Sequence, residues 1–116
     1  MNIQIVGTRK NADTRKCERF FRERGVHYHF VDLAERGLSP GELERIIQAV
    51  GVEELIDTAS KAYSDRGLAY MDFDPVEEVL RSPLLLRQPV VRDGRRACVG
   101  YDETTWTGWI DEERKG

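Results

Sequence analysis

The residues best placed for chemistry surround a short polar turn near the start of the chain. Four basic side chains lie in or beside it: Arg9, Lys10, Arg15 and Lys16. An apolar run precedes the turn and a helix pattern begins near Ala12, so backbone N–H groups and the positive end of the helix dipole point toward the turn. This arrangement predicts a site for an anion such as a carboxylate or a phosphate.

The same arrangement would stabilise a thiolate, but the turn contains no cysteine. The nearest thiol, Cys17, lies more than a helical turn inside the helix and shares one apolar face with Phe20 and Phe21. We therefore expect Cys17 to pack in the core, with the raised pKa of a buried thiol, rather than to act as a displaced nucleophile. Cys98 lies in an apolar triplet and has the same interpretation. A Cys17–Cys98 disulfide is disfavoured in a reducing cytoplasm.

Two histidines form a second candidate site. His27 and His29 alternate around Tyr28, so both lie on one face of a predicted strand. Such a pair could contribute to a metal site, but zinc sites use three or four protein ligands and no third ligand is evident nearby. We expect an exposed strand face here and no metal site.

The elements that hold the turn follow a β-α-β order. The apolar pattern predicts a strand over residues 2–7, a helix over 12–24 and a second strand over 26–33. A connection of this kind implies parallel strands joined by a right-handed crossover. The turn therefore lies at the end of a buried strand.

The rest of the chain reads as a helical insertion and then β-β-α. A helix over residues 40–50 starts with a capping box, a second is predicted over 52–64, and a third begins at Asp74-Pro75. Two short strands flank Asp93-Gly94, which is a hairpin signal, and Asp102 can cap a last helix. The order predicts an α/β, thioredoxin-like fold with a mixed four-stranded sheet, in a single domain spanning residues 1–116.

Composition restricts the function classes. The chain of 116 residues is 40% apolar and 34% charged, which is typical of a soluble globular protein. A net charge of −3 argues against direct nucleic-acid binding. No apolar stretch approaches the roughly 20 residues that span a bilayer. Two cysteines make no disulfide framework. We expect a cytoplasmic protein without a membrane span.

Several short segments agree in order and spacing with a known pattern: Thr14-Arg15-Lys16, Gly51 with Glu54-Leu55-Ile56, Thr58, Ser60-Lys61, Tyr63, Leu85-Leu86-Arg87-Gln88-Pro89-Val90-Val91 and Val99-Gly100-Tyr101. Together they resemble the arsenate-reductase-like family, which includes the ArsC reductases, the YffB-like proteins and the Spx transcription regulators. The resemblance covers about residues 2–110. It implies a thioredoxin-like fold with Pro89 as a cis proline beside the turn.

The residues that this family uses for thiol chemistry are replaced. The catalytic cysteine corresponds to Asn11, and the second cysteine of the C-x-x-C form found in many Spx proteins corresponds to Thr14. An amide cannot act as a thiolate nucleophile. An arginine that ArsC enzymes use for the oxyanion corresponds to Asp57, and the arginine of the Spx redox switch to Ala59. Arsenate reduction by the family mechanism is therefore not expected.

The segment that leads to Pro89 (residues 85–89, the proline loop) departs from the family in part. Gln88 stands where the family has an arginine directly before the proline, whereas Arg87 matches the preceding arginine of the Spx-like form. The turn and this loop could together form one ligand site for glutathione, a phosphate or a partner's carboxylate. The candidate ligand-binding residues are Lys10, Asn11, Thr14, Arg15, Arg87 and Pro89. The simpler alternative is a solvated basic turn in which Asp13 or Asn11 caps the helix.

Two functions remain open. The first is a noncatalytic binding or regulatory protein; Gly51 matches a glycine with which Spx proteins contact the RNA polymerase α subunit, although ending a helix is a sufficient reason for glycine. The second is a glutathione-dependent thiol oxidoreductase, in which Cys17 or a partner's cysteine would supply the sulfur. The loss of the nucleophile at Asn11 favours the first.

Overall fold

The computed structural model describes residues 1–115 and is built on a mixed four-stranded sheet of order β2-β1-β3-β4. The strands are β1 (Ile3–Gly7), β2 (Tyr28–Asp32), β3 (Val90–Asp93) and β4 (Arg96–Val99). β1 pairs in parallel with β2 and antiparallel with β3, and β4 pairs antiparallel with β3. The predicted α/β fold with a mixed four-stranded sheet is confirmed.

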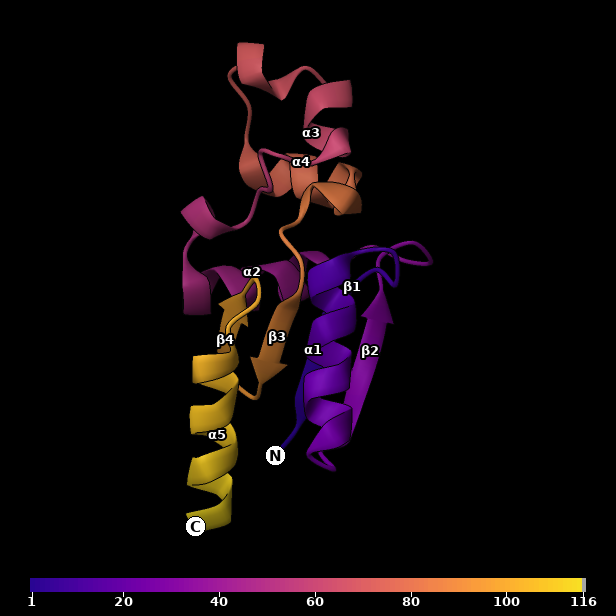
Figure 1. The fold of residues 1–116 in the computed structure, drawn as a ribbon. Coiled ribbons are helices and arrows are strands. Elements are labelled where there is room, and N and C mark those ends of the chain that lie inside the picture. Colours follow the sequence, from indigo (N-terminus) through magenta and orange to yellow (C-terminus); the bar gives the residue numbers. More distant parts are fainter. Residues whose placement is uncertain (116) are drawn as a thin grey trace.

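Five α-helices accompany the sheet in this part of the chain. They are α1 (Ala12–Glu23), α2 (Pro40–Val50), α3 (Lys61–Asp65), α4 (Pro75–Arg81) and α5 (Glu103–Lys115). Figure 1 shows α3 and α4 beyond one end of the sheet, in a helical insertion that follows α2 (residues 52–85, the insertion), and α5 toward the opposite end. The insertion makes the molecule long in one direction, with extents of 48 × 27 × 23 Å.

One face of the sheet packs against α1 and α5. The side chains of Ile3, Ile5 and Val91 point to this face and contact Phe21 of α1 and Trp106 of α5 in one buried cluster. The Phe21 and Trp106 rings lie 5.7 Å apart between centroids. Burial of these aromatic side chains fixes α1 against the sheet and thereby fixes the turn before α1.

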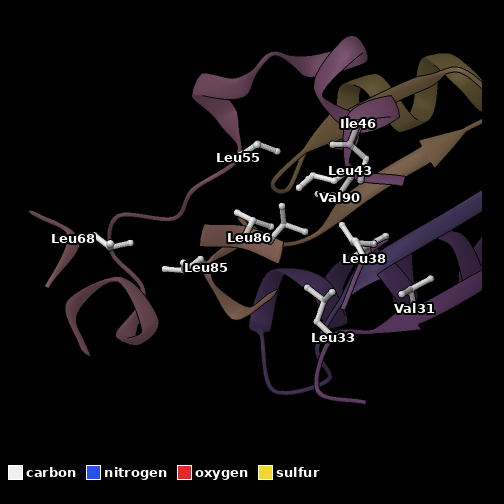
Figure 2. Close-up of a cluster of buried hydrophobic side chains, with 12 residues drawn as sticks. Val31, Leu33, Leu38, Leu43, Ile46, Leu55, Leu68, Leu85, Leu86 and Val90 are labelled. Carbon is white, nitrogen blue, oxygen red and sulfur yellow. The ribbon is translucent and has the colours of Figure 1, made fainter. Parts of the chain in front are cut away.

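The other face packs against α2 and the insertion. Figure 2 shows the cluster formed there by Val31 and Val90 of the sheet, Leu43 and Ile46 of α2, and leucines from the loops and insertion. Alternation along each strand explains the division, since neighbouring side chains such as those of Ile5 and Val6 point to opposite faces.

The helix predicted over residues 52–64 is wrong. The structure has a short 3₁₀ helix at Val52–Glu54, an extended segment, and then α3, which Ser60 caps by accepting from the backbone nitrogen of Tyr63 at 3.1 Å. In the extended segment Ile56 forms an antiparallel bridge with Leu86. Pairing with the proline loop satisfies the backbone of this segment and replaces helical hydrogen bonds.

No helix within residues 1–115 is long and apolar enough to cross a membrane.

Candidate functional site

The turn between β1 and α1 is held by its own helix cap. Asn11 has extended backbone angles, and its Oδ1 accepts from the backbone nitrogen of Thr14 at 2.9 Å and lies 3.2 Å from the Thr14 hydroxyl. This is the N-cap geometry that asparagine favours, because a side-chain oxygen satisfies one of the unpaired N–H groups of the first helical turn. Of the two predicted capping residues, Asn11 is the one used.

Gln88 ties the proline loop to this turn. Its Oε1 accepts from the backbone nitrogen of Thr8 at 2.7 Å and from the Thr8 hydroxyl at 3.1 Å, and it lies 3.4 Å from the hydroxyl of buried Thr14. Gly7 lies so close that a Cβ there would be 2.5 Å from Thr14 Oγ1 and 3.1 Å from Gln88 Oε1. Glycine is therefore required at position 7 for β1 to pass this cluster.

Arg15 supports the turn from outside. Its Nη1 donates to the backbone oxygens of Arg9 and Lys10, at 2.9 and 2.8 Å. The Arg9 guanidinium lies 4.5 Å from the centre of the Phe30 ring and 3.8 Å from Asp32 Oδ2. Within residues 1–115 the Lys10 ammonium has no carboxylate partner, and Lys10 also lines the groove beside the turn, so its charge is available to a ligand there.

A groove of about 650 Å³ opens beside the turn. Arg9, Lys10 and Asn11 form one side, and Lys61 and Asp65 of the insertion form the other, where their side chains pair at 2.7 Å. Further lining residues are Thr8, Asp32, Ala34, Ser60, Ala62, Leu84 and Gln88. A volume of this size suits a small ligand or the side chains of a partner segment.

The groove offers amide donors beside the lysine. Each of Asn11 and Gln88 uses its carbonyl oxygen inside the protein, while the Asn11 Nδ2 and Gln88 Nε2 groups have no acceptor within residues 1–115. Since no buried side-chain polar atom in this part of the chain lacks a partner, neither nitrogen is completely buried. Two neutral N–H donors and one ammonium can bind a carboxylate or carbonyl oxygen, and none of them is a nucleophile at neutral pH.

Much of the proline loop lies outside this site. The Gln88–Pro89 peptide bond is cis, which confirms the prediction from the resemblance. Pro89 itself is buried. The Arg87 guanidinium does not line the groove; it pairs with Glu54 at 2.5 Å. The structure therefore brings Lys10 and Asn11 to the groove, places Thr14 beneath it, and leaves Arg15 and Arg87 outside it.

Both cysteines lie away from the groove. Cys17 is fully buried in the cluster between α1, α5 and the sheet, and burial raises the pKa of its thiol far above the ordinary value, with further contributions from Cys98 and Glu18. Cys98 on β4 is half-buried, and its Sγ accepts from Trp106 Nε1 at 3.2 Å. Burial raises the pKa of Cys98 to about 11 despite that hydrogen bond. At neutral pH neither thiol is appreciably ionised.

Asp57 has a local structural use. Its Oδ1 accepts from the backbone nitrogen of Ala59 at 2.9 Å, and its backbone oxygen accepts from the Ser60 hydroxyl at 2.7 Å. An aspartate that bonds the backbone two residues later stabilises a tight turn. The position that ArsC enzymes give to an arginine, by the resemblance, is thus occupied by a turn residue that leads into α3.

The remaining candidates lie elsewhere. Gly51 ends α2 with φ of 86°, a backbone conformation that favours glycine, and the exposed Val52 follows it. His27 lies one residue before β2, and His29 lies on β2; both are exposed. No group of three potential metal ligands occurs in residues 1–115.

Two contributions to the site were missed by sequence reasoning. One is the acceptor role of Gln88, which the sequence shows only as a departure from the arginine of the family. The other is the wall contributed by Lys61 and Asp65. The Ser60 cap signal could have placed a helix start directly before Lys61, but nothing local shows that this helix faces a turn fifty residues away.

A parallel β1-α1-β2 unit, an antiparallel hairpin, and a cis proline beside the β1–α1 turn define a thioredoxin-like fold. Solved structures agree with this class. An arsenate reductase from Vibrio cholerae matches with a TM-score of 0.77 at 19% identity, over 90% of this chain and 94% of that one. An ArsC family related protein from Bacteroides fragilis matches with a TM-score of 0.82 at 17% identity, over 93% and 97%. At these identities the likeness establishes the fold alone.

The family follows from the sequence. The model of the ArsC family matches residues 7–108, and the chain belongs to this family. Among characterised relatives, the global transcriptional regulator Spx 2 of Oceanobacillus iheyensis is 30% identical over 109 residues, covering 89% of this chain and 79% of that protein. The regulator of the same name from Bacillus cereus is 26% identical over 106 residues, covering 87% and 81%.

Proposed function

We propose that this protein is a noncatalytic, regulatory member of the ArsC family, which binds a partner at the groove beside the β1–α1 turn and carries out no thiol chemistry there. The observation that carries the proposal is the use of Asn11. Its carbonyl oxygen caps α1, and its side chain lines the groove, at the position that the resemblance gives to the catalytic cysteine.

The groove would bind an anionic oxygen of its ligand. The Lys10 ammonium supplies charge, and Asn11 and Gln88 supply neutral N–H donors at fixed positions. A carboxylate accepts from several such donors at once, and charge-assisted hydrogen bonds are the stronger ones. A carboxylate of a partner protein or of glutathione has this chemistry.

A partner in transcription is supported by the relatives. Proteins about 30% identical to this chain are named global transcriptional regulators. By the same resemblance, the RNA polymerase α subunit is the partner we propose, with the corner at Gly51 as a second contact. Val52 beside it is 36% exposed, and a large apolar side chain left in solvent can contribute to an interface.

The alternative is a glutathione-dependent oxidoreductase. It requires a thiolate within reach of the groove. Cys17 and Cys98 are both outside the lining and both have raised pKa values. A thiol of the partner itself would have to supply the sulfur, and the turn would then serve only to bind it.

The test measures binding and turnover on the same preparations. We expect the purified RNA polymerase α subunit to bind the native protein in calorimetry. We expect Lys10→Ala and Val52→Asp to weaken that binding, and the matched variant Lys16→Ala, which removes a lysine outside the groove, to leave it unchanged. With glutathione present, we expect no reduction of arsenate or of a small disulfide above the rate without protein.

Two results would contradict the proposal. Turnover that disappears in Cys17→Ser, with the fold intact by circular dichroism, would make the protein an oxidoreductase with a relocated nucleophile. Binding that is equally strong in Lys10→Ala and Val52→Asp would remove both surfaces from the proposed interface.

A further inference from the structure

The face of the sheet that packs against α2 is divided into an apolar row and a polar row. The register places Val31, Val6, Val90 and Val99 side by side across the four strands, and α2 and the insertion cover this row. Two residues further along each strand, a second row points to the same face, because strand side chains repeat with a period of two. It consists of His29, Gln4, Arg92 and Ala97.

The polar row lies beside two connected hollows. One, of about 370 Å³, lies between α2 and the β3–β4 hairpin and is lined by Arg45, Arg92 and Arg95 together with Gln48. The other, of about 310 Å³, lies over the row itself and is lined by Gln4, His29 and Arg92, with Asn2. Arg92 and Gly94 border both hollows, so the two form one continuous surface.

This surface carries uncompensated positive charge. No acidic side chain lines either hollow. Within residues 1–115 no carboxylate lies within salt-bridge distance of Arg45, Arg92 or Arg95, although the chain has a net charge of −3 and seven other arginines take part in ion pairs. Arg92 donates to Gln4 Oε1 at 3.0 Å, which orients its guanidinium. Asp93, which follows Arg92 in the sequence, is bonded to Arg96 and to the backbone of Asn2.

We propose that the surface formed by Arg45, Arg92 and Arg95 with Gln4, Gln48 and His29 is a binding site for a compact phosphate-bearing small molecule with at least two phosphoryl groups. The site is separate from the groove beside the turn and does not depend on the proposed function. Guanidinium groups bind phosphoryl oxygens in pairs, and the glutamine amides add neutral donors. Two hollows that share Arg92 can each take one phosphoryl group.

The chemistry of the lining favours a small phosphate compound as the ligand, rather than an acidic protein segment or a single-stranded nucleic acid. An acidic protein segment binds through buried aromatic or large apolar anchors, and Ala49 is the largest apolar side chain in either hollow. Single-stranded nucleic acid binds through successive bases stacked on aromatic side chains, and among the residues that line the two hollows only His29 has an aromatic ring, so a row of stacking platforms is missing. A polyphosphate group needs only charge and donors.

The experiment uses inorganic pyrophosphate as the probe, followed by amide resonances of the full chain in NMR and by calorimetry. We expect saturable shifts centred on Gly94, Arg95 and Gln48, with binding that weakens as salt is added. Arg95→Gln, in an exposed hairpin turn, should weaken binding about tenfold, since it removes a charge-assisted contact. Arg92→Gln should do the same or more. Arg81→Gln, an equal charge change on α4, and Lys10→Ala in the groove should leave it unchanged.

Three results would overturn the proposal. One is the absence of saturable binding at low salt. Another is a set of shifts centred on Lys10 to Thr14, with affinity lost in Lys10→Ala, which would assign the anion to the groove and leave the arginine surface without a ligand. The third is a tetraglutamate peptide that binds the arginine surface more tightly than pyrophosphate does, which would make it a docking surface for an acidic protein segment.

Discussion

The side-chain oxygen of Gln88 lies 2.7 Å from the backbone nitrogen of Thr8, so the residue before the cis proline is bonded directly to the turn before α1. This bond needs an acceptor. By the resemblance, the family places an arginine at this position, and a guanidinium carries donors only. The amide therefore joins the loop and the turn in a way that an arginine could not. This hydrogen bond stabilises a turn that contains no cysteine.

Replacing Gln88 by leucine should destabilise the protein, because the nearly buried backbone nitrogen of Thr8 would lose its acceptor. We expect a loss of about 1–3 kcal/mol in the free energy of unfolding, measured in urea. Gln88→Glu keeps the acceptor and should lose less. Gln48→Leu, an exposed glutamine on α2, is the matched control. Equal losses of unfolding free energy in Gln88→Leu and Gln88→Glu would show that the side-chain acceptor does not contribute to stability.

Substitutions of Asn11 test both its role as the N-cap of α1 and the effect of the turn on a thiol placed there. Asn11→Ala should cost about 1 kcal/mol as a lost N-cap, and Asn11→Asp should cost less. In Asn11→Cys the helix end and Lys10 should lower the thiol pKa below the unperturbed value of about 8.5, measured from the pH dependence of its alkylation rate. A new thiol that titrates at the unperturbed value would mean that this helix end does not favour negative charge.

Cys17 should contribute to stability and to nothing else. The side chain is fully buried, so Cys17→Ser places a hydroxyl in an apolar cluster and should cost about 1–3 kcal/mol in urea unfolding. Cys98→Ser, at a half-buried position, should cost less. Binding of the α subunit should be unchanged in both. Loss of binding in Cys17→Ser with an unchanged circular dichroism spectrum would contradict the assignment of Cys17 to the core.

The cap of α2 should make stability depend on pH in the acid range. Hydrogen bonds from Arg36 lower the pKa of Glu42 to about 2, with further contributions from the backbone and side chain of Ser39. Because the folded-state pKa lies below the unfolded one, this stabilisation is present above about pH 4.5 and is lost as the pH falls toward 2.

Glu42→Gln should therefore destabilise the protein by about 1 kcal/mol at neutral pH, and the difference from the native protein should vanish near pH 2. Urea unfolding at several pH values measures this. Glu44→Gln, on the same helix, is the control and should show no such trend. A difference between native and Glu42→Gln that does not change with pH would contradict the role of the charge.

The sheet and its flanking helices were predictable because their signals are local. Alternating apolar residues predict β1, and Ser39-Pro40 with Glu42 predicts the start of α2. The capping box is present there in the structure. Asp93-Gly94 gave the β3–β4 hairpin, with Gly94 at φ of 62°. Each of these depends on residues within a few positions of one another, so sequence patterns contain the required information.

The insertion and the walls of the groove were not predictable in the same way. The helix predicted over residues 52–64 failed because Ile56 pairs with Leu86, a contact between segments thirty residues apart. The expectation that Arg87 faces the turn did not anticipate its pairing with Glu54. Both depend on where the proline loop lies relative to the insertion, and that is decided by tertiary packing rather than by local propensity.

The proposal that this protein carries out no thiol chemistry is tested most directly by the reactivity of its own thiols. Native protein would be treated at neutral pH with a thiol reagent and, separately, with glutathione disulfide, and followed by intact mass, with Asn11→Cys as the positive control. We expect Cys17 and Cys98 to stay unmodified until the protein unfolds, because burial keeps both protonated. Fast, selective modification of Cys17 in the folded protein would contradict this and make Cys17 a working nucleophile.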